Sequence, residues 1–257
     1  MTLLADDRGL LLGDGLFETL LWKDGALVDA EAHAARLIRG CAVLGLPAPR
    51  AEGFIRAAEE AAAAASVAAG RLAVRLTWTA GSGGRGLDRP AQPRCRLFAA
   101  ARPAPAFRGP ARLATAGVRR NDGSPSARLK TLAYVDNVLA RAEARDAGAD
   151  EALMLNTQGH VACAAAANIF WFEGDRLVTP ALDCGVLDGI ARGRVLEAAV
   201  RLGVAAALPA AERSRLDNAR GLFLTNSLIG LRPVGWLDGQ EVEPHPMTAR
   251  LAEAARL

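Results

Sequence analysis

Stretches with the residue pattern of β-strands alternate with stretches that have the pattern of helices in both halves of this chain. Residues 71–80, RLAVRLTWTA, alternate apolar and polar side chains as a half-buried strand does. Residues 29–46 instead place apolar side chains at roughly the spacing of an amphipathic helix. Later in the chain, EALMLN, HVACA and NIFWFE are expected to form strands before a helix over 189–203. This order predicts an α+β protein.

The segment 102–112, RPAPAFRGPAR, is a candidate boundary between two domains. It contains three prolines and has little periodicity, as a connecting segment does. The chain has 257 residues, 51% of them hydrophobic, which is enough for two domains with their own cores. We expect a small α/β domain over 1–106 and a larger α/β domain over 107–257. Further elements are expected as two strands around a turn within 10–30, a helix over 51–69, a strand over 94–101 and a helix over 132–147.

The charge balance and the cysteine spacing argue against several classes of protein. The net charge is only +3, and the chain has no basic tract interleaved with aromatic residues, so nucleic acid is not an expected partner. The longest uncharged apolar stretch, residues 61–70, is too short to span a membrane, and the N-terminus is acidic where a secretory signal is basic. We therefore expect a cytoplasmic protein. The chain has four cysteines, which are not spaced as metal ligands or as a disulfide framework would be: Cys41, Cys95, Cys163 and Cys184.

Lysine is rare in this chain, which has two lysines among 31 basic residues. Lys23 lies in a Lys-Asp-Gly turn, where a solvated lysine is ordinary. Lys130 lies directly before the amphipathic helix expected over 132–147, where a partly apolar pocket would favour a neutral amine able to attack a carbonyl group. Arginine cannot form that imine. Lys130 is therefore the candidate catalytic residue.

Three further features indicate a site for a phosphate group. Small residues lead into the helix over 189–203 and leave the amides of Gly189 and Ile190 free. Arg36, on the first predicted helix, offers a positive charge. Hydroxyl and amide groups of the kind that phosphates bind end the strand-like segment RGLFLTNSLIG, at Thr225, Asn226 and Ser227. Each feature has an ordinary alternative as a helix cap, a surface arginine or a strand end, but together with Lys130 they indicate pyridoxal phosphate.

The segment GSGGRG, residues 81–86, formally matches the dinucleotide-binding fingerprint. That fingerprint requires a helix immediately afterwards and an acidic residue about 20 residues further on. Here LDRPAQPR follows, with two prolines, and no acidic residue occupies the later position. We interpret the segment as a mobile loop that presents Arg85, and the alternative is a plain hairpin connection.

The order of the motifs along nearly the whole chain resembles that of the class IV aminotransferases, which are fold-type IV pyridoxal-phosphate (PLP) enzymes. That family includes branched-chain and D-amino acid aminotransferases and aminodeoxychorismate lyase. The resemblance implies a D-amino acid aminotransferase-like fold with a small N-terminal α/β domain and a larger barrel-like C-terminal domain. It also implies pyridoxal 5'-phosphate bound between the domains, and a homodimer. The motifs are DRGLLLGDGLFETL, HAARL, GSGGRG, LKTLAYVDNVLAR, ADEALMLNTQGHV, AANIFWFEGDRLVTPAL, CGVLDGIAR and TNSLIGLRPV.

The resemblance also implies roles for single residues. Lys130 corresponds to the lysine that forms the Schiff base with PLP. Arg36 corresponds to the arginine that binds the phosphate of the cofactor. The family's remaining phosphate contacts, two amides and a hydroxyl group with its neighbour, correspond to Gly189, Ile190, Ser227 and Asn226.

One position departs from the family pattern. Five residues before Asn168 the family has a glutamate whose carboxylate meets the pyridine nitrogen of PLP, and this chain has Cys163. A carboxylate keeps that nitrogen protonated, whereas a mostly neutral thiol does so less well. We therefore expect a weaker electron sink, which hinders transamination more than a rapid elimination.

Within the family the chain resembles aminodeoxychorismate lyase most, through GSGGRGL, AAAANIFW and its short length. The implied reaction eliminates pyruvate from 4-amino-4-deoxychorismate and gives 4-aminobenzoate. The substrate replaces Lys130 in the Schiff base, and the freed lysine removes a ring proton. Arg85 is a candidate to bind a carboxylate of this small-molecule amino substrate. Two alternatives stay open: an aminotransferase acting on D- or branched-chain amino acids, and a catalytically degenerate PLP-binding homologue.

Overall fold

The computed structural model describes residues 4–65, 70–107 and 109–257, and the chain divides into two units. Unit 1 comprises Met1–Pro105 together with the short segment Leu129–Ala133. Unit 2 comprises Ala106–Arg128 and Tyr134–Leu257. The segment that contains Lys130 therefore belongs to unit 1, although both of its neighbours in the sequence belong to unit 2.

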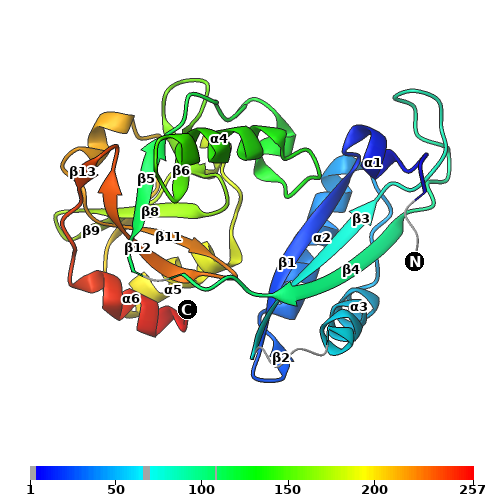
Figure 1. Cartoon of the computed structure of the whole chain (residues 1–257), viewed down its shortest axis with the longest axis horizontal. Coiled ribbons are helices and arrows are strands. Elements are labelled where there is room, and N and C mark those ends of the chain that lie inside the picture. Colours follow the sequence, from blue (N-terminus) through cyan, green and yellow to red (C-terminus); the bar gives the residue numbers. More distant parts are fainter. Residues whose placement is uncertain (1–3, 66–69, 108) are drawn as a thin grey trace. The chain divides into compact units, whose positions relative to one another are not determined.

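Unit 1 is built on a four-stranded antiparallel sheet with the strand order β2-β1-β3-β4 (Figure 1). Strand β1 pairs with β3 over its whole length, and β3 pairs with β4. The long strands form because apolar residues recur at every second position, which gives one face of the sheet a continuous apolar surface. The elements of this unit are α1 (Arg8–Leu12), β1 (Gly15–Lys23), β2 (Ala26–Leu27), α2 (Ala30–Leu44), α3 (Ala51–Ala64), β3 (Arg71–Thr79) and β4 (Arg96–Pro103).

Helices α2 and α3 pack on this sheet and close the core of unit 1. Leu16 and Leu20 of β1 point to the same side as Glu18 and contact the buried face of α2. Phe17 points to the opposite side of the strand. The helix predicted over 29–46 is confirmed by α2. The helix predicted over 51–69 ends as α3 at Ala64, and residues 66–69 lie outside the described residues.

Helix α1 was not predicted, and its ends explain why it forms. The Asp7 side chain accepts a hydrogen bond from the backbone N–H of Gly9 and so caps the first turn. Gly13, with a φ of 66°, closes the helix in the left-handed conformation that glycine adopts without strain. Five residues are too few for a helical period to be recognised.

Unit 2 contains a nine-stranded sheet with the order β10-β9-β8-β11-β12-β5-β6-β7, and β13 pairs with β12 (Figure 1). The pairs β12–β5 and β5–β6 are parallel, and the pairs on either side of them are antiparallel. The strands are β5 (Ala111–Thr115), β6 (Glu151–Leu155), β7 (Val161–Ala164), β8 (Asn168–Glu173), β9 (Arg176–Val178), β10 (Ala206–Ala207), β11 (Arg220–Asn226), β12 (Gly230–Leu237) and β13 (Gln240–Glu241). The helices are α4 (Val135–Asp146), α5 (Ile190–Arg201) and α6 (Met247–Ala255).

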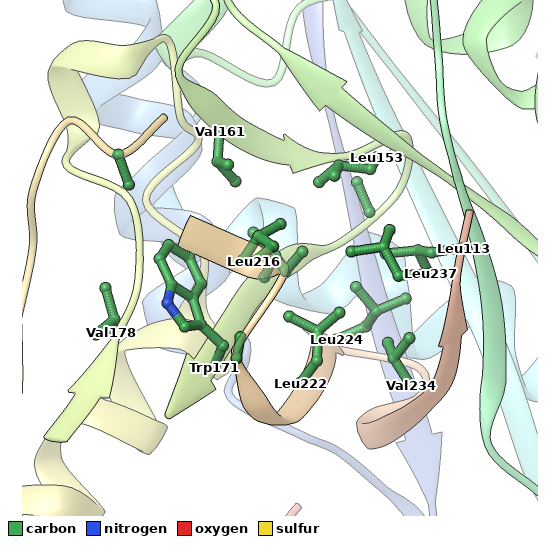
Figure 2. Close-up of a cluster of buried hydrophobic side chains, with 14 of the residues drawn as sticks. Leu113, Leu153, Val161, Trp171, Val178, Leu216, Leu222, Leu224, Val234 and Leu237 are labelled. Carbon is green, nitrogen blue, oxygen red and sulfur yellow. The ribbon is translucent and has the colours of Figure 1, made fainter. Parts of the chain in front are cut away.

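The sheet of unit 2 curls around an apolar interior. Side chains from strands across the sheet meet in one cluster, which Figure 2 shows around Trp171, Leu153 and Leu224. The opposite face of β8 and β11 carries Phe170 and Phe223, which pack under α5 and α6. The alternation of the two faces along each strand explains this division. The expected barrel-like second domain is confirmed, and within the described ranges no helix is long and apolar enough to cross a membrane.

Candidate functional site

The backbone of the segment Leu129–Ala133 is fixed by hydrogen bonds to β1. The N–H of Phe17 donates to the carbonyl of Lys130 at 2.8 Å, and the N–H of Leu132 donates to the carbonyl of Gly15 at 3.0 Å. Thr131 forms a β-bridge with Leu16 between these two bonds. The segment is thus a short extra strand on β1, and the position of Lys130 is set by strand pairing rather than by the helix that follows it.

The side chain of Lys130 lies over an aromatic ring. Its Nζ is 4.3 Å from the centroid of the Phe17 ring, and the Arg75 guanidinium lies over the same ring at 3.8 Å. Such cation–π contacts hold an ammonium group while the ring covers one side of it. Lys130 is half-buried, as expected for an amine that is both positioned and reachable.

Arg36 is held by a buried carboxylate that the sequence analysis missed. Its Nε and one terminal nitrogen donate to the two oxygens of Glu18 at 2.8 and 2.6 Å, and His33 Nδ1 lies 2.7 Å from the same carboxylate. Burial raises the pKa of Glu18, but hydrogen bonds from Arg36 and His33 outweigh it and lower the pKa to about 2. The sequence signal for this carboxylate is a charged residue, Glu18, on the otherwise apolar face of β1 between Leu16 and Leu20.

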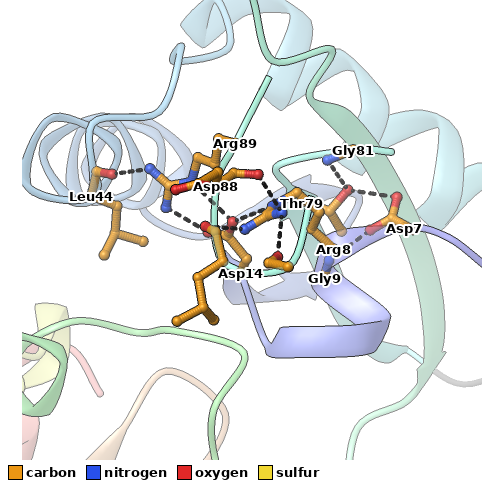
Figure 3. Close-up of polar contacts among 11 residues, drawn as sticks. Asp7, Arg8, Gly9, Asp14, Leu44, Thr79, Gly81, Asp88 and Arg89 are labelled. Carbon is orange, nitrogen blue, oxygen red and sulfur yellow. Dashed lines mark hydrogen bonds and ion pairs between the residues drawn. The ribbon is translucent and has the colours of Figure 1, made fainter. Parts of the chain in front are cut away.

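The loop that contains Arg85 is anchored to α1, as Figure 3 shows. Arg8 is buried, and its terminal nitrogens donate to the carbonyl groups of Gly86, Leu87 and Asp88. Asp14 in turn accepts one hydrogen bond from Arg8 and two from Arg89. Arg85 itself is exposed, as the sequence analysis expected, although the loop around it is tied to the rest of unit 1.

The glycines of GSGGRG serve the backbone of this loop. Gly81 has a φ of 75°, and a Cβ atom there would lie 2.0 Å from the carbonyl oxygen of Arg94. Gly84 has a φ of 84°, and its Cβ would lie 2.1 Å from the carbonyl oxygen of Asp88. Both conformations and both contacts require glycine. The motif is therefore explained by loop geometry, and no helix follows it.

In unit 2 the loop before α5 packs against β8. The Asn168 side chain donates through Nδ2 to the carbonyl of Leu187 at 2.9 Å. A Cβ atom on Gly189 would lie only 2.0 Å from Asn168 Oδ1, so this position requires glycine. Helix α5 begins at Ile190 with Gly189 as its N-cap, and the amides of its first turn have no intrahelical acceptor. This helix start is suited to an anion such as phosphate.

The end of β11 lies beside the start of β8, because Thr225 pairs with Asn168. The Asn226 side chain donates to the carbonyl of Ala166 at 2.9 Å and accepts from the N–H groups of Leu228 and Ile229. Asn226 therefore shapes the turn. The hydroxyl group of Thr225 is buried and has no hydrogen-bond partner in the described part of the chain, which is costly unless a ligand supplies one.

Cys163 lies on β7 opposite Met154 of β6 and is 6% exposed. Burial raises the pKa of its thiol. The thiol therefore stays neutral at neutral pH and carries no charge to a ligand.

Unit 2 brings three of the predicted positions, Gly189, Ile190 and Asn226, to the linked ends of β8 and β11.

Comparisons with known proteins identify the family. The sequence model of the amino-transferase class IV family matches residues 15–235. A putative branched-chain-amino-acid aminotransferase of Methanocaldococcus jannaschii is 31% identical over 242 residues, which cover 92% of this chain and 83% of that protein. A bifunctional aminodeoxychorismate lyase / D-amino acid transaminase of Mycobacterium tuberculosis is 27% identical over 267 residues, covering 97% and 90%. The crystal structure of a putative 4-amino-4-deoxychorismate lyase from Legionella pneumophila matches with a TM-score of 0.93 at 28% identity, covering 100% of this chain and 95% of that one.

The chain belongs to the class IV aminotransferase family and is a PLP-dependent lyase or aminotransferase. The described residues of unit 2 fit the phosphate group of PLP. A glycine-lined helix start and the unpartnered hydroxyl of Thr225 supply donors for an anion. The fit to the pyridine nitrogen is poor, because Cys163 offers a neutral buried thiol.

Replacing the buried carboxylate of unit 1 with an amide, Glu18→Gln, should destabilise the protein by about 3–5 kcal/mol at pH 7, because Arg36 loses its buried partner. The folded-state pKa of Glu18 lies below its ordinary value of 4.5, so its stabilising contribution is complete above that value. The contribution is lost as the pH falls from about 4.5 toward 2. Urea unfolding at pH 7 and pH 3 should therefore show a smaller difference between wild type and variant at pH 3.

The matched control is Glu60→Gln. Glu60 faces Arg56 at 3.7 Å, but both side chains are more than two-thirds exposed. Removing such a pair changes stability by about 0.5 kcal/mol or less. An equal loss at both positions, or a Glu18→Gln difference that does not depend on pH, would contradict the buried ion-pair account.

Proposed function

We propose that this protein is a PLP-dependent 4-amino-4-deoxychorismate lyase that releases pyruvate and forms 4-aminobenzoate for folate biosynthesis. The observation that carries the choice of reaction is Cys163, a buried neutral thiol where the family pattern has a carboxylate. A neutral group there makes the PLP ring a weaker electron sink. Elimination from aminodeoxychorismate ends in an aromatic ring, so it tolerates a weak sink better than transamination does.

The proposed roles of the residues follow the family pattern. When bound, PLP supplies an electron-withdrawing ring next to the substrate amine. Lys130 would hold the cofactor through its amine, and the same amine, once free, would remove the proton from the substrate ring carbon that bears nitrogen. As the ring becomes aromatic, the C–O bond on the neighbouring carbon breaks, and the enolpyruvate that leaves takes up a proton at its methylene carbon, which yields pyruvate. The phosphate is assigned to Arg36, to the amides of Gly189 and Ile190, and to Ser227 beside Asn226.

The second candidate function is an aminotransferase acting on D- or branched-chain amino acids. It is favoured by the M. jannaschii and M. tuberculosis relatives, whose names include branched-chain and D-amino acid transamination. An aminotransferase must return its amino group to a 2-oxo acid. The two candidates therefore differ in their products rather than in their cofactor.

We also propose a homodimer in the cytoplasm. Three consecutive leucines of α1, Leu10 to Leu12, and Leu87 of the anchored loop are exposed, with Leu87 84% exposed. Exposed apolar side chains gathered near one another are typical of an interface. Purely monomeric sedimentation at micromolar concentration would contradict the dimer. The proposal of a cytoplasmic location is supported by the four cysteines, which are all free thiols, and recovery of the protein from the periplasm would contradict it.

The lyase proposal predicts equal amounts of pyruvate and 4-aminobenzoate from 4-amino-4-deoxychorismate when the purified protein is incubated with PLP. Lys130→Ala should lower this rate by at least about 10²–10⁴-fold, the usual effect of losing a general base. Lys23→Ala is the matched control, because Lys23 is the other lysine and its side chain is 54% exposed. Amino transfer to a 2-oxo acid without release of pyruvate would contradict the lyase and support the second candidate.

Arg85 is proposed to bind a carboxylate of the substrate. Arg85→Ala should raise KM by about 10–100-fold with a smaller change in kcat, because a charge-assisted hydrogen bond contributes about 1.5–3 kcal/mol. Arg94→Ala is the control, since Arg94 is also exposed and follows the same loop. Steady-state kinetics with varied aminodeoxychorismate measure the effect. An unchanged KM in Arg85→Ala would remove Arg85 from the site.

A further inference from the structure

Arg120 is a buried cation that has no carboxylate partner among the residues that the structure describes. It is 8% exposed, in the loop between β5 and α4. Its guanidinium donates to the carbonyl of Gly185 at 2.9 Å, to Asn137 Oδ1 at 3.2 Å and to the carbonyl of Ala127. All three acceptors are neutral. A guanidinium carries a positive charge in proteins, and neutral acceptors do not balance it.

The other two buried arginines of the described residues each have a carboxylate partner. Arg8 donates to the carboxylate of Asp14 at 2.9 Å, and Arg192 donates to that of Asp188 at 3.1 Å. A buried charge normally needs such a partner, because the loss of hydration costs several kcal/mol per ion. Arg120 is therefore the exception, and the missing negative charge calls for an explanation.

The side chain of Asn137 links Arg120 to the strand that carries Cys163. Its Oδ1 accepts from Arg120, and its Nδ2 donates to the carbonyl of Ala165 at 2.8 Å. The same Nδ2 lies 3.9 Å from the sulfur of Met154, the residue that pairs with Cys163 across β6 and β7. Through the Asn137 side chain, Arg120 is thus linked to Ala165, which directly follows β7, and to Met154 of β6, the residue that pairs with Cys163.

Among the described residues, two charged side chains act on the thiol of Cys163, those of Arg120 and Glu151, and the negative one is already paired. Burial raises the pKa of the thiol most, Arg120 opposes this effect and Glu151 adds to it. Glu151, however, is paired with Arg141 at 2.5 Å. Of these two charges, that of Glu151 is thus balanced by Arg141, whereas that of Arg120 has no carboxylate partner among the described residues. A cation disfavours protonation of a nearby base.

We propose that Arg120 and Cys163 form a subsite that keeps the pyridine nitrogen of PLP unprotonated, with Arg120 acting as a positioning residue through its positive charge. This inference rests on the proposed function, which assigns the cofactor nitrogen to the position of Cys163. The inference goes beyond the loss of a carboxylate, because a buried positive charge, that of Arg120, would act at this position in place of the family's negative charge. The subsite then accepts an uncharged ring nitrogen and selects against chemistry that needs a strongly electron-withdrawing ring.

The test reads the cofactor directly. The holoenzyme is reconstituted with PLP labelled with ¹⁵N in the ring, and the ¹⁵N chemical shift reports protonation of the nitrogen at pH 7. The expected result is an unprotonated nitrogen in the wild type and a protonated one in Cys163→Glu. In Arg120→Met the nitrogen should titrate at a higher pH than in the wild type. Arg119→Met is the matched control, because Arg119 is the exposed neighbour of Arg120 and should change nothing.

A protonated nitrogen in the wild-type holoenzyme at pH 7 would overturn the inference and leave the proposed function intact. If PLP instead fails to bind the wild type, the proposed function fails with it. Arg120→Met removes three hydrogen bonds and can therefore unfold the protein. A second variant, Arg120→Lys, keeps the positive charge. It should leave the nitrogen unprotonated.

A second readout needs no cofactor. In the apo-protein, Cys163→Glu introduces a carboxylate close to the guanidinium of Arg120. The midpoint of urea unfolding should fall less for Cys163→Glu in the wild-type background than in the Arg120→Lys or Arg120→Met background, because the arginine offers the new carboxylate a well-placed partner. An equal fall in every background would show that Arg120 does not act on position 163, and the inference would be wrong.

Discussion

The pairing of residues 129–133 with β1 is the constraint on which the proposed chemistry depends. Two backbone hydrogen bonds, at Phe17 and Leu132, fix this segment in unit 1 although the chain on both sides of it belongs to unit 2. The Lys130 amine is then held over the ring of Phe17. A nucleophile mounted on a paired strand is positioned more rigidly than one on a free loop, which is what repeated attack and proton transfer at one atom require.

Buried charge is distributed unevenly between two regions of the protein. In unit 1 the carboxylate of Glu18 is matched by Arg36 and His33, so that the position of this arginine side chain is fixed. In unit 2 the guanidinium of Arg120 has neutral acceptors alone. The first arrangement is an ion pair that fixes the side chain of Arg36, and removing its carboxylate is expected to cost stability. The second leaves a buried positive charge without a counter-ion, which is costly, and this is why we connect Arg120 with the proposed function.

Much of the fold was predictable, because its long helices and strands have clear periods. The alternation of residues 71–80 and the helical spacing of 29–46 correspond to β3 and α2. Helix α1 was missed because five residues held by end caps show no period. Lys130 stood out through the rarity of lysine, but its attachment to β1 depends on pairing between distant segments, which no local pattern records. Arg120 was missed because an arginine among 29 does not reveal in sequence that it lacks a counter-ion.

The most direct test of the central claim is to reduce the PLP-loaded protein with borohydride and to map the modified peptide by mass spectrometry. Reduction makes the bond between cofactor and lysine permanent, and the chain offers two lysines for it. The account predicts a pyridoxyl group on Lys130 and none on Lys23. A label on Lys23, or no label on a protein that binds PLP, would contradict the role assigned to the strand-mounted lysine.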